Sequence, residues 1–295
     1  MRRTMYTAAF GVLSGAMALS LAGAAGAGEP LDPIAAPGEI RTPQQLLIAL
    51  ERVDDKVETL QADIQYDRRF RLQGDQHVRR GKLFYRAERE GEPGESGRIR
   101  PKRAFEIDFV DLWLVTAGRK EADRQVWVFD GRWLIEKRPD KKQFVAREIA
   151  GPGEDFDPLS IKEGIMPIPI GQRAADVLER FDVALVDHNT GLDGEPATLV
   201  AFAGDCYQLL LTPKAEFAED SKFTEIRLWY EREALMPKMS RAVDQKGDVS
   251  FVQLLNVERN ERLPMGVMAV APPPENEGWD VQVERRRDAA ADAGQ

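Results

Sequence analysis

Residues 62–72 read ADIQYDRRFRL, and this stretch decides the fold. Apolar and polar side chains alternate along it, which is the pattern of a long β-strand with one face buried and the other in water. Gly74-Asp75 then predicts a turn, and residues 81–86, which read GKLFYR, predict the returning strand. The chain therefore begins an antiparallel sheet by pairing neighbouring strands.

A helix is expected directly before this strand. Thr42 is suited to cap it, Pro43 fits the first helical position, and Gln45 completes a capping box. Apolar residues then recur every three or four positions, which predicts an amphipathic helix that must bury one side. These residues are Leu46, Leu50, Val53, Val57 and Leu60.

The rest of the chain is also dominated by strand patterns. Asp130-Gly131 predicts a tight hairpin turn. The segment 164–171 is interrupted by prolines and fits neither a helix nor a central strand. A second helix is expected over residues 172–180. Further strands are expected over residues 103–112, 126–129, 132–136, 143–149, 183–186, 198–202, 207–211, 224–232, 238–244 and 249–259. The fold class is therefore mainly β (α+β), with about 10–11 strands in a single strongly curved antiparallel sheet covered by helices.

The N-terminus reads as an export signal. Arg2-Arg3 precede an uncharged run, and Ala25-Gly26-Ala27 supplies the small residues of a cleavage site. A transmembrane anchor is the alternative reading, since the run is almost long enough to span a bilayer. We expect cleavage near Ala27, a flexible lead-in over residues 28–41 and a disordered tail over residues 284–295.

Charge and cysteine content limit the classes of partner. The net charge is −9, and removal of the signal makes the chain more acidic, which argues against nucleic acid. Cys206 is the only cysteine, so it cannot form an internal disulfide, and we expect it to be a small buried side chain. A monomer is expected.

Motifs for catalysis or metal binding are weak. The two histidines are isolated, and neither zinc-ligand spacing nor a Gly-x-Ser-x-Gly elbow occurs. Glu106, Asp108 and Asp111 alternate on one expected strand and would suit calcium or a glycosidase, although such a face is more often simply in water. The pairs Arg68-Arg69 and Arg79-Arg80 are interpreted as cross-strand salt-bridge partners. We expect no catalytic residue, no metal and no cofactor.

Large apolar side chains are plentiful for a chain with few helices. Five tryptophans and thirteen phenylalanines are present. They could fill an ordinary core, which is the default interpretation. A curved sheet also has a concave face, and an apolar hollow left there would suit a lipid.

Six stretches, in order along the chain, resemble one known family. They are Leu60–Ile64, Gly81–Tyr85, Asp130-Gly131 with Arg138–Gln143, Tyr207–Lys214, Asp244 with Gly247-Asp248 and Asn260, and Pro272-Pro273 with Gly278–Val281. Together they resemble the LolA-like periplasmic outer-membrane lipoprotein carriers, over about Thr42 to Val283. The chain would be a divergent member of that family.

The resemblance implies an unclosed half-barrel lidded by helices, whose apolar cavity takes the acyl chains of lipoproteins or another lipid. An inner-membrane transporter would supply the cargo and an outer-membrane acceptor would receive it, without bond chemistry. The expected cavity residues are Ile64, Tyr66, Phe70, Leu83, Tyr85, Ile107, Phe109, Leu209 and Leu211. The expected lid residues are Leu46, Leu50, Val53, Ile165, Met166, Ile168 and Ile170.

Two departures from the family leave alternatives open. The family's lid-holding arginine on the second strand matches Ala87 here, which leaves the neighbouring Arg86 as the candidate latch. The segment from Ala150 to Arg180 is also longer than the family's lid region. An envelope-stress sensor or regulatory module on the same fold, binding protein or lipid signals, is the second hypothesis. An enzyme using the carboxylates around Asp108 is the third.

Overall fold

The computed structural model describes residues 40–89, 101–151, 161, 168 and 170–286, in which one large sheet carries helices on both faces. The helices are α1 (Pro43–Asp54), α2 (Ala174–Arg180) and α3 (Ala197–Phe202), with short 3-10 helices η1 (Pro139–Lys141), η2 (Ala215–Phe217) and η3 (Glu275–Glu277). The strands are β1 (Thr59–Phe70), β2 (Asp75–Glu88), β3 (Lys102–Leu114), β4 (Arg119–Glu121), β5 (Gln125–Phe129), β6 (Trp133–Arg138), β7 (Gln143–Glu148), β8 (Phe181–Val186), β9 (Cys206–Pro213), β10 (Phe223–Glu231), β11 (Pro237–Asp244), β12 (Val249–Arg259) and β13 (Asp280–Glu284).

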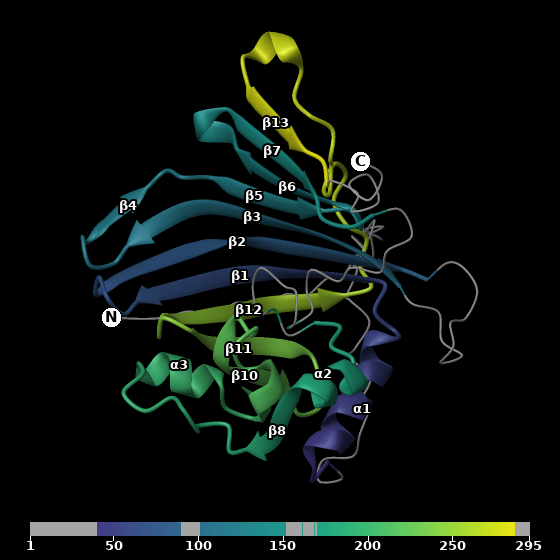
Figure 1. The fold of residues 1–295 in the computed structure, drawn as a ribbon, viewed down its shortest axis with the longest axis vertical. Coiled ribbons are helices and arrows are strands. Elements are labelled where there is room, and N and C mark those ends of the chain that lie inside the picture. The colour runs from purple at the N-terminus through teal and green to yellow at the C-terminus, as the bar shows by residue number, and fades with distance from the viewer. Residues whose placement is uncertain (1–39, 90–100, 152–160, 162–167, 169, 287–295) are drawn as a thin grey trace, which may run out of the picture.

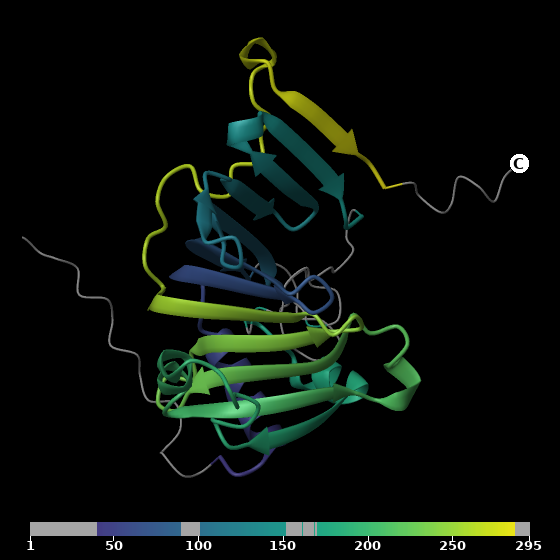
Figure 2. The ribbon, with the colours of Figure 1, turned by 90° about the vertical axis from the view of Figure 1, so that its left-hand side faces the viewer.

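The strands lie in the order β13-β7-β6-β5-β3-β2-β1-β12-β11-β10-β9-β8, with β4 paired to β3. Every pair is antiparallel except β13 with β7, which is parallel. The two ends of this order do not meet, so the sheet is curved but unclosed, as Figures 1 and 2 show. This confirms the expected fold class, with thirteen strands in the described residues in place of ten or eleven.

The expected hairpin turns are present at the sites that the sequence indicated. Gly74 and Gly131 both have positive φ, a conformation that glycine adopts without strain. The Asp130 side chain accepts hydrogen bonds from the backbone N–H groups of Arg132 and Trp133, which closes the β5–β6 turn.

Several boundaries differ from the expectation. Residues 198–202, expected as a strand, lie in α3, because this run has no strict alternation and packs its Leu199, Val200 and Phe202 on the sheet. The first helix ends at Asp54. Val57, the fourth residue of the expected apolar stripe, therefore lies in the connection, and Leu60, the fifth, lies in β1. The second helix, expected from residue 172, begins at Ala174, and its buried residues are Ala174 and Val177.

The two faces of the sheet carry separate apolar clusters. The concave cluster joins alternate residues of β1–β3 and β8–β12 with α1 and α2. On the convex face one cluster lies under α3 and includes Trp229, and the other lies under residues 263–268 and includes Ile135. Alternation therefore places successive residues of a strand, such as Leu228 and Trp229, in different clusters.

Some expectations lie outside the described residues. These are the signal peptide (1–27), the lead-in except for its last two residues, the lid residues Ile165 and Met166, and the tail beyond residue 286. Glu284 belongs to β13, so it is not part of a tail. None of the helices described is both long and apolar enough to cross a membrane.

Candidate functional site

The concave face gathers most of the expected cavity residues into one cluster. Ile64, Leu83, Tyr85, Ile107, Phe109, Leu209 and Leu211 are each at most 3% exposed there, and Tyr66 packs against them from the margin. They come from β1, β2, β3 and β9, strands that are far apart in sequence, and the register brings their side chains to the same side. The structure thus brings together every expected cavity residue except Phe70, and their role in binding stays a prediction.

Phe70 is the exception within this set. It lies at the end of β1, where its ring contacts the His77 ring, with the ring centroids 4.9 Å apart. The Arg68 guanidinium lies 4.8 Å from the centre of the same ring. Phe70 therefore packs within the β1–β2 hairpin and not in the concave cluster, because the sheet extends beyond the area that the helices cover.

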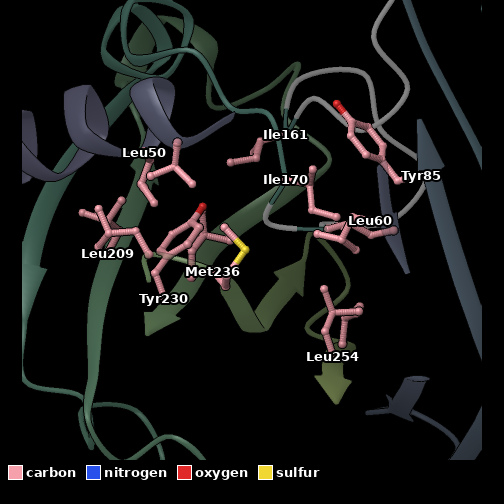
Figure 3. Packing of buried hydrophobic residues seen from close by; sticks show 14 of the residues in the cluster. Leu50, Leu60, Tyr85, Ile161, Ile170, Leu209, Tyr230, Met236 and Leu254 are labelled. Atoms are coloured by element: carbon pink, nitrogen blue, oxygen red, sulfur yellow. The ribbon is translucent and has the colours of Figure 1, made fainter. Parts of the chain in front are cut away.

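Two helices and three isoleucines cover the concave cluster, and we call them the lid. The lid consists of α1, α2, Ile161, Ile168 and Ile170. α1 buries Leu46, Leu47, Leu50 and Val53. Figure 3 shows Leu50 near Leu209, Tyr230 and Met236, and Ile170 near Leu60. The expected lid residues that the structure describes thus form a layer on the apolar face.

Arginine side chains at the sheet donate hydrogen bonds to backbone carbonyl groups of the lid and of the segments that adjoin it. Arg89, just after β2, donates to the carbonyl oxygens of Asp54 (2.5 Å) and Val57 (3.1 Å) at the C-terminal end of α1. Arg103 on β3 donates to the carbonyl of Gly171 at 2.8 Å. A cation at a helix C-terminus is favoured because the last carbonyls have no partner within the helix.

Polar contacts also join the parts of the lid to each other. A Glu51 carboxylate oxygen of α1 accepts from the Ala174 backbone N–H at the start of α2, at 2.7 Å. The buried Gln172 amide accepts from Ile161 and donates to the carbonyls of Ile168 and Ile170. The lid therefore has an internal framework of its own, separate from its apolar contact with the sheet.

The candidate latch Arg86 does not reach the lid. Its side chain is 49% exposed and pairs with Glu88 at 2.9 Å. Arg86 points to the face opposite Tyr85 and Ala87, which are buried in the concave cluster. Arg89 makes the contact instead, since it follows Ala87 by two residues and so continues the same face. Period two along β2 was the signal that could have identified it.

The lining of the concave face becomes more polar toward β5. The Phe109 ring stacks on Tyr66, with centroids 6.3 Å apart, and meets the Trp127 ring edge-on at 6.0 Å. Beside them Asp123 pairs with Arg79 at 2.6 Å and with Lys141 at 3.1 Å. Burial pushes the pKa of Asp123 upward, but these two cations outweigh it and the net pKa is lowered. The cluster therefore borders on fixed charges.

The carboxylates that could have formed an enzyme or calcium site each have another partner. Glu106 accepts from the Met268 backbone N–H at 2.6 Å, Asp108 pairs with Arg124 at 2.7 Å, and Asp111 pairs with Lys120 at 3.7 Å. Within the described ranges no group of three metal-ligating side chains occurs. The ion pairs of Asp108 and Asp111 and the main-chain hydrogen bond of Glu106 fit a role in stabilising the convex face.

Other polar residues also match structural roles. Arg68 lies within 3.8 Å of Asp244 and 3.6 Å of Asp248, and Arg69 pairs with Glu195 at 2.7 Å. These are salt bridges, but their partners do not lie on the strands next to β1, so they are not the cross-strand pairs that were expected. Arg80 donates to the uncharged Gln65 at 2.9 Å. Cys206 is fully buried, and burial raises the pKa of its thiol to about 11. Its expected place as a small buried side chain is confirmed.

Comparison with known proteins gives matches among solved structures only. No protein-family model matches the chain, and no curated protein matches it. An uncharacterized conserved protein from Thermus thermophilus is 14% identical, and the match covers 82% of this chain and 98% of that protein's chain, with a TM-score of 0.40. A LolA superfamily protein from Nitrosomonas europaea has 12% identity, covers 78% and 98%, and has a TM-score of 0.31.

A third similar structure is MucB, which has 15% identity and a TM-score of 0.38. The match covers 77% of this chain and 62% of the MucB chain. MucB is also represented by a structure in complex with MucA(peri). These likenesses concern the fold, so the functional argument that follows rests on the concave face and its lid.

Proposed function

We propose that this protein is a periplasmic carrier that binds the acyl chains of a lipoprotein or another lipid between the concave face and the lid. A transporter in the inner membrane would load it, and an acceptor in the outer membrane would unload it. The observation that carries the proposal is a continuous apolar face covered by a separate layer. That layer packs on the sheet through apolar side chains, and arginines of the sheet donate to its main chain.

Burial alone can supply the affinity for such a ligand. Each methylene group removed from water contributes about 0.8 kcal/mol, so a long chain can replace the apolar contacts that the lid gives up. The lid side chains Leu46, Leu50 and Val53 are at most 4% exposed, and they must therefore move or share the face with the ligand. No bond is made or broken, and release reverses the exchange.

One observation favours the regulatory alternative. In the described residues the lid fills the concave face closely, with Leu209 and Leu211 fully buried beneath it. A sensor that binds another protein would be expected to keep such a filled core. This second function differs from the carrier in predicting a stable protein partner and no exchangeable lipid.

Native mass spectrometry after purification from a Gram-negative periplasm, followed by lipid extraction, tests the carrier. We expect co-purifying acyl species, or stoichiometric uptake of a fluorescent fatty acid by the stripped protein. A protein that is free of lipid and takes up no fatty acid would overturn the carrier. Capture of one stable protein partner in that case would support the sensor.

A pair of variants on one strand locates the site. Tyr66→Ala removes a ring that packs on the concave cluster, while Phe70→Ala removes one that packs on His77 at the hairpin end. Both rings are partly exposed, so both variants should fold. We expect weaker fatty-acid binding for Tyr66→Ala only, and equal loss in both would place the ligand elsewhere.

A further inference from the structure

The sheet ends in an edge strand whose outer side is unpaired. β13 is the last strand in the order of the sheet, and no other described strand or helix lies beyond it, as Figure 2 shows. It lies at the end of the sheet far from α1 and α2 (Figure 1). An unpaired edge carries backbone N–H and C=O groups that can pair with another extended chain.

The register shows which backbone groups of β13 point outward. The Asp280 N–H donates to the Lys142 carbonyl at 2.8 Å, so Asp280 directs its backbone groups toward β7. These groups alternate in direction along a strand, so Val281 and Val283 direct theirs away from β7. Their side chains share the convex face with Phe144, which is opposite Val281, and are 41% and 54% exposed. An added strand can therefore bond to both valines and cover their side chains.

The other face of this edge holds a small polar pocket. Side chains of β6, β7 and β13 line it, namely Glu136, Arg138, Gln143, Val145, Asp280 and Gln282. Its volume is about 240 Å³, below the roughly 300–1,000 Å³ of small-molecule sites, so it suits a single side chain better than a whole ligand.

One carboxylate of this pocket has no cation beside it. Glu136 pairs with Arg138 at 2.7 Å. Asp280 accepts from the uncharged Gln282 amide at 3.1 Å, and no lysine or arginine of the described residues pairs with its carboxylate. A basic side chain that enters the pocket from outside supplies the missing cation, because opposite charges on neighbouring strands stabilise each other.

We propose that the β13 edge binds an extended segment of a partner protein in which apolar and basic side chains alternate. The segment adds to the sheet as an antiparallel strand, with apolar residues opposite Val281 and Val283 and a basic residue between them. That basic residue lies opposite Gln282, on the face of the pocket and diagonal to Asp280. Main-chain hydrogen bonds supply affinity and the pocket supplies specificity. This inference goes beyond the proposed function, since it involves neither the concave cluster nor the lid.

A second copy of this chain fits the edge less well. Antiparallel self-pairing of β13 centred on Gln282 places Asp280 opposite Glu284 of the second copy. Like charges directly opposite each other are destabilising. Arg147 pairs with Glu284 at 3.0 Å, but Asp280 has no cation to offset this contact. The charges of the edge therefore favour a basic partner over self-association.

The experiment measures peptide binding to the purified protein by fluorescence anisotropy. A labelled peptide of alternating valine and lysine is compared with one of alternating valine and glutamate, and with one that has the same valines and lysines in two blocks. The blocked peptide controls for general attraction to an acidic protein. We expect the alternating lysine peptide to bind on the order of 5-fold more tightly than either of the others.

Two substitutions separate the backbone pairing from the charge. Val281→Pro removes an outward N–H and keeps the pairing with β7, since proline is tolerated where an edge N–H faces solvent. We expect it to weaken binding of the alternating lysine peptide on the order of 5-fold, with the melting temperature of wild type. Asp280→Lys should reverse the preference toward the glutamate peptide. Asp193→Lys, the same change at another exposed aspartate, should not.

Three outcomes would overturn the inference. Equal binding of the alternating and blocked lysine peptides would show general attraction and no added strand. Binding that neither Val281→Pro nor Asp280→Lys changes would place the peptide elsewhere. A wild-type dimer that Val281→Pro dissociates would identify a second copy as the occupant. Fatty-acid uptake, measured separately, tests the proposed function and is unaffected by these results.

Discussion

Arg89 is the residue whose side chain contacts the main chain of the lid at the end of α1. Replacing it with glutamine removes a charged donor to two carbonyls at the end of α1. We expect a loss of about 1–2 kcal/mol in local stability, seen as faster amide hydrogen exchange in α1. Arg86→Gln serves as the control, since an exposed substitution costs within about 0.5 kcal/mol. Unchanged exchange in Arg89→Gln would show that apolar contacts alone hold the lid.

Glu106 should give the stability a dependence on pH. Burial, its largest cause, raises the pKa of Glu106 above its ordinary value of 4.5, although the Met268 N–H and Lys137 oppose it. A pKa that is higher in the folded state stabilises the fold at low pH, and this contribution is lost as pH rises through the folded value. We therefore expect the difference in melting temperature between Glu106→Gln and the wild type to shift in favour of the variant as the pH rises from about 4.5 toward neutrality. A difference that does not vary with pH would contradict this.

At the residue scale the sequence predicted burial better than contacts. Alternation along β1 and β2 correctly predicted that Ile64, Leu83 and Tyr85 are buried. Successive side chains of a strand point to opposite faces, so each residue can lie on only one of two faces. The candidate latch Arg86 followed a family position, and its side chain pairs with Glu88 on the other face. Arg89 was not among the expected residues, although it has the same parity along β2 as Tyr85 and Ala87. The carbonyl partners of Arg89 lie more than thirty residues away in sequence, so no local pattern indicated them.

At the scale of elements, α1 is expected to open independently of the sheet. The Thr42 hydroxyl accepts from the Gln45 N–H at 3.2 Å, and the Gln45 side chain accepts from the Thr42 N–H, also at 3.2 Å. Thr42→Ala should cost about 1 kcal/mol of helix stability. We expect faster hydrogen exchange in α1, faster fatty-acid uptake, and unchanged exchange in β1 and β2. Equal acceleration throughout the sheet would show that lid and sheet unfold as one unit.

The elements missed by the sequence are those without a buried stripe. All five residues of β13 are exposed. Its sequence alternates polar and apolar residues, but Val281 and Val283 reach no core, and the backbone pairing with β7 defines the strand. β4 is three residues long and charged. α1, by contrast, was predictable because its cap, its proline and its apolar spacing all agree. The pairing of β13 with β7 joins segments that are far apart in sequence, and five alternating residues were too short a pattern to indicate it.

At the scale of the whole molecule, the sheet separates a face proposed for binding from a face that only stabilises. Ile107 and Ile135 make a matched pair, since each is 1% exposed, but Ile107 lies in the concave cluster and Ile135 in a convex one. Shortening either to valine should cost about 0.5–1.5 kcal/mol of unfolding free energy, measured in urea. Fatty-acid affinity should change in Ile107→Val and remain at the wild-type value in Ile135→Val, because only the first side chain faces the lid. Equal changes in affinity would mean that ligand binding depends on the overall stability of the fold, and would contradict the assignment of the concave face as the binding site.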